Sequence, residues 1–314
     1  MRVVVLAGGF GGARMAHGLA MLDDVELTVI GNTGDDFELH GLHIAPDLDT
    51  LMYTLAGVAN RQTGWGVADE TWSAAETLER YGAPTWFRLG DRDLATHIVR
   101  TAQLRAGHRL TDVTAELCQR LGVAPRLLPL TDDRLRTRLL TADGWLDFQD
   151  WFVRRRHRDA VQALDFDGAS AARPTPEALA AIAGAELIVI APSNPFVSIG
   201  PLLAVPGTLD ALRAAGARVV AVSPIVGGQA LRGPAEQLLR SLANDSGAAG
   251  VARHYAQRAP GLVDWFVIDE TDAAAAEQVR QAGPEPLVLP SVMDSDEARR
   301  RLADAIVRAA GPRA

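Results

Sequence analysis

Lysine is absent from this 314-residue chain, so all 31 residues counted as Lys or Arg are arginines. Without lysine the chain cannot form a phosphate-binding loop of the Walker type, which needs Gly-Lys-Ser/Thr. Schiff-base catalysis is excluded as well, because it needs an amine nucleophile. Cysteine is nearly absent: Cys118 stands alone, which excludes an internal disulfide and a pair of thiols for a metal.

Net positive charge and long apolar runs are also missing. A formal net charge of −8 argues against wrapping a nucleic-acid backbone, which requires basic stripes. The basic run at residues 154–158 is typical of a solvated helix end; the alternative is that it binds an anionic tail of the substrate. No stretch approaches the roughly 20 apolar residues that span a bilayer, and residues 1–7 are too short for a signal peptide. We therefore expect a cytoplasmic protein that binds neither nucleic acid nor membrane.

The chain does contain a regular alternation of strand and helix patterns. Residues 3–6 form a β-branched run that ends in glycines, residues 13–21 have helical character, and residues 25–30 supply a second strand. This opening predicts an α/β fold with a doubly wound, mostly parallel, Rossmann-like sheet, in which ligands gather at the carboxyl ends of the strands. Alternation returns after Pro174, where we expect strands at 187–191, 217–222, 265–268 and 286–289 and a closing helix at 297–309.

The middle of the chain lacks this regular alternation of strand and helix. It predicts helices at 70–81, 93–106, 111–121 (with Thr111 as its cap) and 148–155, and short strands at 126–130 and 134–141. We predict that residues 56–174 form a mainly helical inserted cap that binds the acceptor, and that 1–55 and 175–314 form the nucleotide-binding core. The insert is rich in tryptophan, which suits a flat ligand ring, and core packing is the alternative reading. These residues are Trp65, Trp72, Trp86, Trp145 and Trp151.

The first glycine-rich turn resembles the dinucleotide fingerprint but does not satisfy it. From Gly9 the sequence reads Gly-Phe-Gly-Gly-Ala-Arg, so Arg14 stands where the third glycine belongs. The acidic residue that would hold a ribose about 20 positions later is also missing, which disfavours a nicotinamide enzyme. Gly9, Gly11 and Gly12 still let the backbone approach a phosphate at a helix start, and Arg14 adds a charged donor. A tight turn without ligand is the alternative.

Four aspartates follow within fifteen residues, at positions 35, 36, 47 and 49. Carboxylate oxygens suit Mg²⁺, which takes one or two carboxylates together with waters and substrate phosphates. An uncoordinated carboxylate nearby could orient or deprotonate an attacking hydroxyl. Helix capping and loop solvation are the alternative, since aspartate is common in turns. Two pairs of aspartates flanking an apolar segment favour a functional site.

Three further motifs are weaker when taken alone. In Gly90-Asp91-Arg92-Asp93, either aspartate could cap the following helix, and His97 alone reads as a structural histidine. Ser193 and Asn194 follow one predicted strand of the second half, and Ser223 follows the next. These positions place short polar side chains where a nucleotide would lie in a doubly wound sheet, although ordinary turn chemistry gives the same residues.

Taken together, these motifs resemble the CofD/FbiA transferases of coenzyme F420 biosynthesis. They run in family order through most of the chain, to about Tyr255, and jointly are highly specific. The matching segments are residues 6–14, 32–36, 46–50, 89–97, 191–195, 204–207 and 223–227.

The resemblance implies a reaction and a set of site residues. The donor is a guanosine diphospho-linked three-carbon acid, lactyl or enolpyruvyl, and the terminal ribityl hydroxyl of the deazaflavin Fo attacks its β-phosphorus and releases GMP. The arginine-rich, bacterial composition of the chain favours the enolpyruvyl donor over the lactyl donor. Asp35 and Asp47 would ligate Mg²⁺, and Asp49 and Arg92 would contact Fo. Asp49 and Asp36 are the candidates for a base. The guanosine diphosphate would be held by Gly9, Gly11, Gly12, Ser193 and Asn194, to which the turn chemistry above adds Arg14 and Ser223.

Two other functions compete with this interpretation. A non-catalytic nucleotide-sugar-binding regulator of the YvcK type shares the glycine turn and the Asn-x-Gly-Asp-Asp motif, but the second acidic motif and residues 90–93 favour the transferase. A Rossmann oxidoreductase is weakened by the missing ribose acid. The family resemblance also implies a homodimer.

Overall fold

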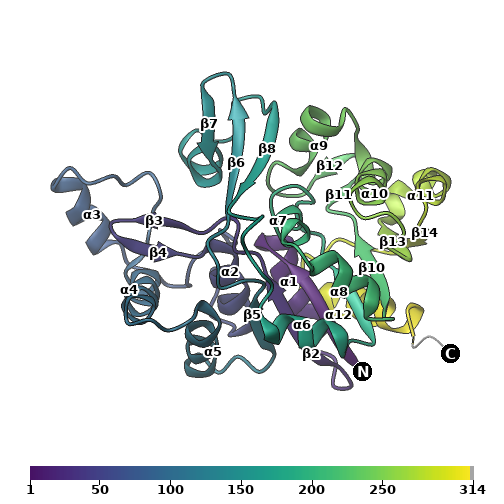
Figure 1. Ribbon diagram of the computed structural model, residues 1–314, viewed down its shortest axis with the longest axis horizontal. Coiled ribbons are helices and arrows are strands. Elements are labelled where there is room, and N and C mark those ends of the chain that lie inside the picture. Colours follow the sequence, from purple (N-terminus) through teal and green to yellow (C-terminus); the bar gives the residue numbers. More distant parts are fainter. Residues whose placement is uncertain (312–314) are drawn as a thin grey trace.

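A seven-stranded parallel sheet forms the centre of the computed structural model, which describes residues 1–311 (Figure 1). The order across the sheet is β5 (Arg126–Pro129), β2 (Glu26–Gly31), β1 (Arg2–Ala7), β9 (Leu187–Ile190), β10 (Arg218–Val222), β13 (Trp265–Ile268) and β14 (Glu285–Val288). The predicted α/β class is confirmed. The strand order reverses between β1 and β9, where Leu6 pairs with Ile30 on one side and with Ile190 on the other. Ligands bind at such a reversal in doubly wound sheets.

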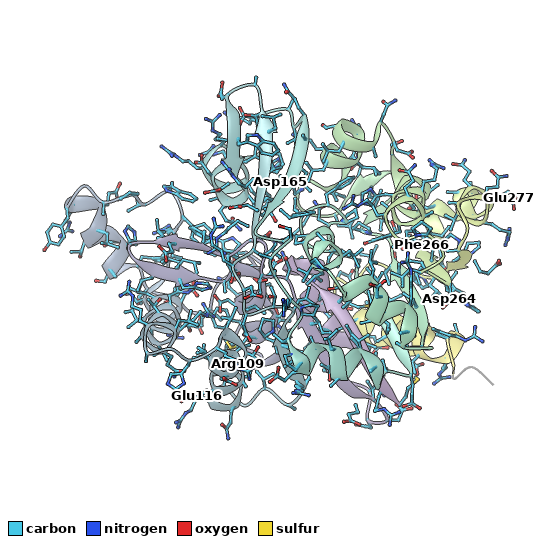
Figure 2. The ribbon with its side chains drawn as sticks, in the orientation of Figure 1. Arg109, Glu116, Asp165, Asp264, Phe266 and Glu277 are labelled. Atoms are coloured by element: carbon cyan, nitrogen blue, oxygen red, sulfur yellow. The ribbon has the colours of Figure 1, made fainter. Side chains whose placement is uncertain are left out.

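Helices cover both faces of this sheet. The side chains of β1 are apolar on both faces, so both must be shielded from water. Val3 and Val5 face one buried cluster, and Val4 and Leu6 face another. The first cluster includes residues of α1 (Gly9–Ala20), α2 (Pro46–Leu55), α5 (Leu110–Arg120) and α12 (Asp296–Ala309). The second includes residues of α6 (Pro176–Ala183), α7 (Gly200–Ala204), α8 (Thr208–Ala214), α9 (Ala235–Ala243), α10 (Gly247–Arg258) and α11 (Ala276–Ala282). Phe266 of β13 is fully buried in this second apolar cluster (labelled in Figure 2).

The remaining elements extend from one end of the sheet. A hairpin and two helices lie at the left of the view in Figure 1, and a small antiparallel sheet stands at its top. The first group is β3 (Phe37–Leu39), β4 (Leu42–Ile44), α3 (Ser73–Arg80) and α4 (Asp91–Arg105). The second is β6 (Arg136–Thr141), β7 (Gly144–Asp147), β8 (Ala163–Asp167) and the π-helix η1 (Asp150–Arg154). Short elements β11 (Ile225–Val226), β12 (Gln229–Ala230) and η2 (Glu270–Ala275) complete the fold.

Several local expectations differ from the structure. Strand β5 falls inside the range predicted as an insert, yet it pairs with β2 at the edge of the main sheet. Helix α1 begins at Gly9, four residues before the predicted start. Thr111 does not cap α5, since the cap position is Arg109 and the Thr111 N–H donates to Asp132 Oδ1. Arg109 also pairs with Glu177 of α6 at 2.8 Å, which ties α5 to the core (Figure 2).

Among residues 1–311, no helix is both long enough and apolar enough to cross a membrane.

Candidate functional site

A cavity of about 980 Å³ opens at the point where the strand order reverses. Its walls come from the turns after β1, β9 and β10, from α2 and α4, and from residues near η1. Ligand pockets in proteins typically measure 300–1,000 Å³, so this one has room for a large ligand or two smaller ones. Nine of the predicted site residues line it: Gly9, Gly11, Arg14, Asp35, Asp47, Asp49, Ser193, Asn194 and Ser223.

The glycine turn is built for close backbone approach. Ser193 Oγ accepts from the Gly8 N–H at 3.2 Å and donates to the Gly8 carbonyl at 2.8 Å, which joins the ends of β1 and β9. A Cβ on Gly11 would overlap the Pro192 carbonyl, so this position requires glycine. Gly12 does not line the cavity; a Cβ there would lie 2.8 Å from Ser193 Oγ, so its role is to let α1 pack against the sheet.

The aspartate nearest the turn is Asp47, in the first turn of α2. Its Oδ1 accepts from the Gly9 N–H at 2.7 Å, and its Oδ2 accepts from Asn32 Nδ2 at 2.8 Å. Burial raises the pKa of Asp47 to about 6, although the hydrogen bonds from Asn32 and Gly9 oppose that shift. Because burial disfavours the ionised form of Asp47, a cation bound nearby would stabilise its carboxylate.

Asp35 completes this first acidic cluster, which consists of Asp35 and Asp47. Burial, and then the charge of Asp47, raise the pKa of Asp35 well above its ordinary range. Within residues 1–311, Asp35 Oδ1 is buried and has no hydrogen-bond partner. Buried oxygens without a counter-charge form a donor set that fits a hard divalent cation such as Mg²⁺.

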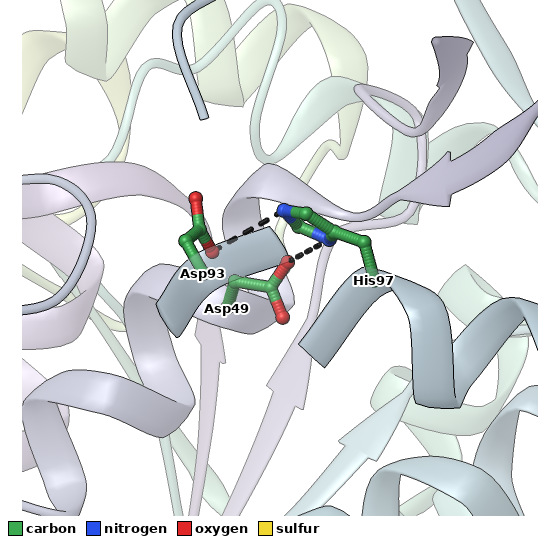
Figure 3. Close-up of side chains that lie close together, drawn as sticks. All are labelled: Asp49, Asp93 and His97. Carbon is green, nitrogen blue, oxygen red and sulfur yellow. Dashed lines mark ion pairs between the residues drawn. The ribbon is translucent and has the colours of Figure 1, made fainter. Parts of the chain in front are cut away.

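Asp49 belongs to a separate cluster with Asp93 and His97, shown in Figure 3. His97 Nε2 lies 3.2 Å from Asp93 Oδ1, and its Nδ1 lies 3.7 Å from Asp49 Oδ2. Arg100, which is only 1% exposed, donates to both Asp49 oxygens, through Nη1 at 3.0 Å and through Nη2. Tyr53 donates its hydroxyl to Asp93 Oδ1 at 2.8 Å. We call Asp49, Tyr53, Asp93, His97 and Arg100 the second cluster.

The second cluster could also offer three ligand atoms to a metal, because those of Asp49, Asp93 and His97 lie within 4.8 Å of one another. However, the Arg100 guanidinium already neutralises Asp49 through both oxygens. Arg100 Nη1 also lies 3.2 Å from His97 Nδ1, so a second cation here would face a fixed positive charge. The first cluster is therefore the better fit for a metal.

Sequence reasoning missed Tyr53 and Arg100, and read His97 as an isolated structural histidine. Helical spacing could have revealed the group, since Asp49 and Tyr53 are four residues apart on α2, and Asp93, His97 and Arg100 follow i, i+4 and i+7 spacing on α4.

Besides Gly12, two predicted residues lie outside the cavity. Asp36 is buried and its Oδ2 contacts His43 Nε2 at 2.9 Å. Arg92 is exposed on α4, where its Nη1 donates to the Ala68 carbonyl at 3.1 Å. Neither aspartate beside Arg92 caps α4, which was one of the two alternatives for them. Glu70 accepts from the N–H groups of Arg92 and Asp93, and Asp91 accepts from residues at the start of α3.

Aromatic side chains form much of the remaining wall. Phe148 lies just before η1 and Phe152 lies within it; their rings stack with centroids 5.3 Å apart and planes only 9° apart. Three of the five tryptophans in the predicted insert also line the cavity, whereas Trp151 is core and Trp145 lies on β7 outside it. Besides Phe10 and Tyr53, the lining aromatics are Trp65, Trp72, Trp86, Phe87, Phe148 and Phe152. Such walls suit a flat ring.

The loops after β9 and β10 offer fewer free groups than their composition suggested. Asn194 Oδ1 accepts from the Phe196 N–H at 2.9 Å, while its Nδ2 is buried without a partner in the described part of the chain. Ser223 Oγ is occupied by its own turn, since it donates to the Ile225 carbonyl at 2.9 Å. Asn194 is therefore the better prepared of the two to bind a ligand acceptor atom.

Comparison with known proteins gives consistent results. The sequence model of the family described as 2-phospho-L-lactate transferase CofD matches residues 3–309. A phosphoenolpyruvate transferase of Streptomyces griseus subsp. griseus is 48% identical over 309 residues, covering 96% of each chain. Its namesake in Mycobacterium avium is 46% identical over 307 residues, covering 89% of this chain and 91% of the relative. A crystal structure of a UPF0052 family member from Bacillus halodurans shares the fold, with a TM-score of 0.67 at 16% identity over 98% of both chains.

Proposed function

Because the chain belongs to the CofD transferase family, we propose that it transfers an enolpyruvyl phosphate group from a guanosine diphospho-linked donor to the deazaflavin Fo. The enolpyruvyl donor is chosen because curated relatives at 46–48% identity are named phosphoenolpyruvate transferases. A lactyl donor is the alternative, since the family description names 2-phospho-L-lactate.

The observation that carries this proposal is the composition of one continuous cavity. It joins a glycine turn and the first acidic cluster to Asp49 and a set of aromatic walls. A diphosphate suits the glycine turn, and a tricyclic ring suits the aromatic walls. One cavity could therefore hold the donor and the acceptor side by side.

In the proposed reaction, the ribityl hydroxyl oxygen of Fo forms a bond to the β-phosphorus of the donor. The bond from that phosphorus to the bridging oxygen breaks, and GMP leaves with the electron pair. Asp49 lines the cavity and is fixed by Arg100, so it is placed to orient the hydroxyl. Asp49 is also our candidate for the proton acceptor. Asp36 is poorly placed for that role, because it contacts His43 and does not line the cavity.

Asp35 and Asp47 would hold Mg²⁺, with Asp47 kept against the glycine turn by the Gly9 N–H. When bound, Mg²⁺ supplies positive charge that neutralises phosphate oxygens during transfer. Gly9, Gly11, Arg14 and Asn194 would contact the nucleotide from the turns after β1 and β9. We further propose that the protein is a homodimer, as the family resemblance suggests.

The decisive experiment supplies Fo, Mg²⁺ and either synthetic donor, and identifies the product by mass spectrometry. We expect the dehydro form of coenzyme F420-0 from the enolpyruvyl donor, with GMP released in equal amount. A product only from the lactyl donor would change the donor assignment. No transfer from either donor, by protein that is folded and Mg²⁺-loaded, would overturn the proposed reaction.

A further inference from the structure

Two arginines at the cavity wall share one aromatic partner. Phe10 and Arg14 lie four residues apart on α1, and the Arg14 guanidinium carbon stacks 3.9 Å from the Phe10 ring centre. Arg232 comes from the loop before α9, and its guanidinium carbon lies 4.3 Å from the same ring centre. All three residues line the cavity beside the glycine turn. Two positive charges are therefore gathered at the start of α1.

Neither arginine has a carboxylate in contact, although the more distant charge of Asp294 partly offsets that of Arg14. Arg14 and Arg232 form no ion pair with a carboxylate anywhere in residues 1–311, and Arg14 Nε is buried without a hydrogen-bond partner. Burial, and then the charges of Arg299 and Arg232, lower the pKa of Arg14 to about 10. Arg100 differs in this respect, because both of its Nη groups bind Asp49. The excess charge at Arg14 and Arg232 faces a cavity rather than an internal partner.

Arg232 also holds a loop over this corner of the cavity. We call residues 60–66 the strap: Arg232 Nη1 donates to the Thr63 carbonyl at 2.5 Å, and Nη2 donates to the Gln62 carbonyl at 3.3 Å. Gly64 has a φ of +77°, and a Cβ there would lie 2.5 Å from both Arg232 Nη1 and the Phe10 ring. The strap therefore needs glycine to lie this close to Arg232 and Phe10. In the described structure Arg232 Nε makes no hydrogen bond, so the guanidinium can serve the strap and an anion together.

From these contacts we infer that Arg14 and Arg232 form a clamp for the diphosphate of the nucleotide donor, and that Arg232 couples the bound anion to closure of the strap. A guanidinium binds phosphate oxygens in a planar, paired geometry, and two of them beside a helix start would match a diphosphate. The nucleotide class rests on the proposed function, whereas the recognition of a diphosphate rests on the two unpaired arginines.

Calorimetric binding in Mg²⁺ tests the clamp with GDP, guanosine and inorganic pyrophosphate as probes. We expect Arg232→Ala to weaken GDP binding by about 10- to 100-fold, the usual range for losing hydrogen bonds to a charged group. Guanosine binding should be unchanged, because it lacks phosphates. Arg213→Ala is the matched control, since Arg213 is an exposed arginine on α8 outside the cavity and should bind GDP as wild type does.

Two further variants keep the test decisive. Arg232→Lys retains the positive charge but lacks the planar, two-pronged set of donors of a guanidinium, so we expect an intermediate loss of GDP affinity. This variant remains informative even if Arg232→Ala folds poorly. Gly64→Ala keeps both arginines but pushes the strap away, and it should also weaken GDP binding. Equal GDP affinity in wild type, Arg232→Ala and Arg232→Lys would overturn the clamp and leave the transferase proposal intact.

The pyrophosphate arm separates the two proposals. If wild type binds pyrophosphate in an Arg232-dependent manner but shows no preference for GDP, the clamp stands and the guanosine donor is wrong. If wild type binds neither GDP nor pyrophosphate, the clamp is overturned, whatever the outcome of the transfer assay.

Discussion

The two acidic clusters lie side by side in one cavity but solve the problem of buried charge in opposite ways. In the first, Asp35 and Asp47 are buried beside the glycine turn, and Asp35 Oδ1 has no partner in the described residues. In the second, the Arg100 guanidinium donates hydrogen bonds to both carboxylate oxygens of Asp49. We therefore propose that the first cluster takes up a cation from outside, whereas the second has its cation built into α4. The difference predicts opposite responses to metal, pH and substitution.

The division arises from helix geometry. Asp47 and Asp49 are two residues apart in α2, so their side chains point about 200° apart around the helix axis. Asp47 consequently faces the Gly9 N–H, while Asp49 faces Arg100 of α4. A motif that looks like one cluster in the sequence thus serves two separate sites.

The largest effect is expected from Asp47→Asn. The variant removes a proposed metal ligand from the first cluster, and a catalytic metal supplies several kcal/mol of charge stabilisation. We expect transfer, measured as kcat/KM with Fo and donor, to fall by roughly a thousandfold, equivalent to about 4 kcal/mol. Asp23→Asn, on an exposed loop residue, is the control and should leave kcat/KM unchanged. Near-normal transfer by Asp47→Asn at ordinary Mg²⁺ would refute the metal assignment.

Arg100→Met tests the built-in cation. Removing one partner of a buried ion pair leaves an uncompensated charge, so the free energy of unfolding should fall by about 3–5 kcal/mol. Urea unfolding measures this loss, which Arg100→Met/Asp49→Asn should partly reverse. Asp35→Asn supplies the contrast, because removing a charge from the uncompensated cluster should not destabilise the metal-free protein. Equal destabilisation by Arg100→Met and Asp35→Asn would show that the two clusters do not differ.

The sequence alone was sufficient to predict the features that depend on a local pattern of residues. The β-branched run at residues 3–6 and the glycines after it identified β1 and its turn, since a buried parallel strand and a tight turn have their own composition. Clustering alone indicated that the four aspartates at 35, 36, 47 and 49 form a functional site, whereas the choice of Asp35 and Asp47 as metal ligands came from the family resemblance. Arg232 was not predicted, because its role depends on contacts across 169 residues that no local pattern encodes. Arg100 shares a helix face with Asp93 and His97, but its partner Asp49 lies 51 residues away in the chain, so the spacing alone does not identify the ion pair. Strand β5 was misplaced because its short apolar run gives no indication of its partner β2.

A pH titration without metal should sharpen the comparison further. The pKa of Asp47 is raised from 3.8 to about 6 on folding, so the folded state holds its proton more tightly than the unfolded state. That contribution to stability is fully present below pH 4 and is lost as pH rises through 6, a loss of about 3 kcal/mol. In EDTA, the stability of wild type relative to Asp47→Asn should therefore fall between pH 4 and 7.

Adding Mg²⁺ should restore the lost stability only in wild type. A ligand at a hundred times its dissociation constant adds about 2.7 kcal/mol when it binds the native state alone. Thermal unfolding at pH 7 with and without Mg²⁺ measures this difference. A flat pH response of wild type relative to Asp47→Asn, together with no stabilisation by Mg²⁺, would show that the first cluster needs no external cation.

The smallest effect is expected from Asp36→Asn, which tests whether the first cluster extends beyond the cavity. Asp36 contacts His43 and does not line the cavity, so it has no path to the reacting hydroxyl. The variant alters one hydrogen bond, and we expect unfolding free energy to change by about 1 kcal/mol while kcat stays within about twofold. Stopped-flow or fixed-time assays of transfer across pH 6–9 measure the second quantity. A hundredfold loss of kcat in a variant of near-normal stability would instead make Asp36 the base and move the reacting centre from Asp49 to the turn beside Asp35.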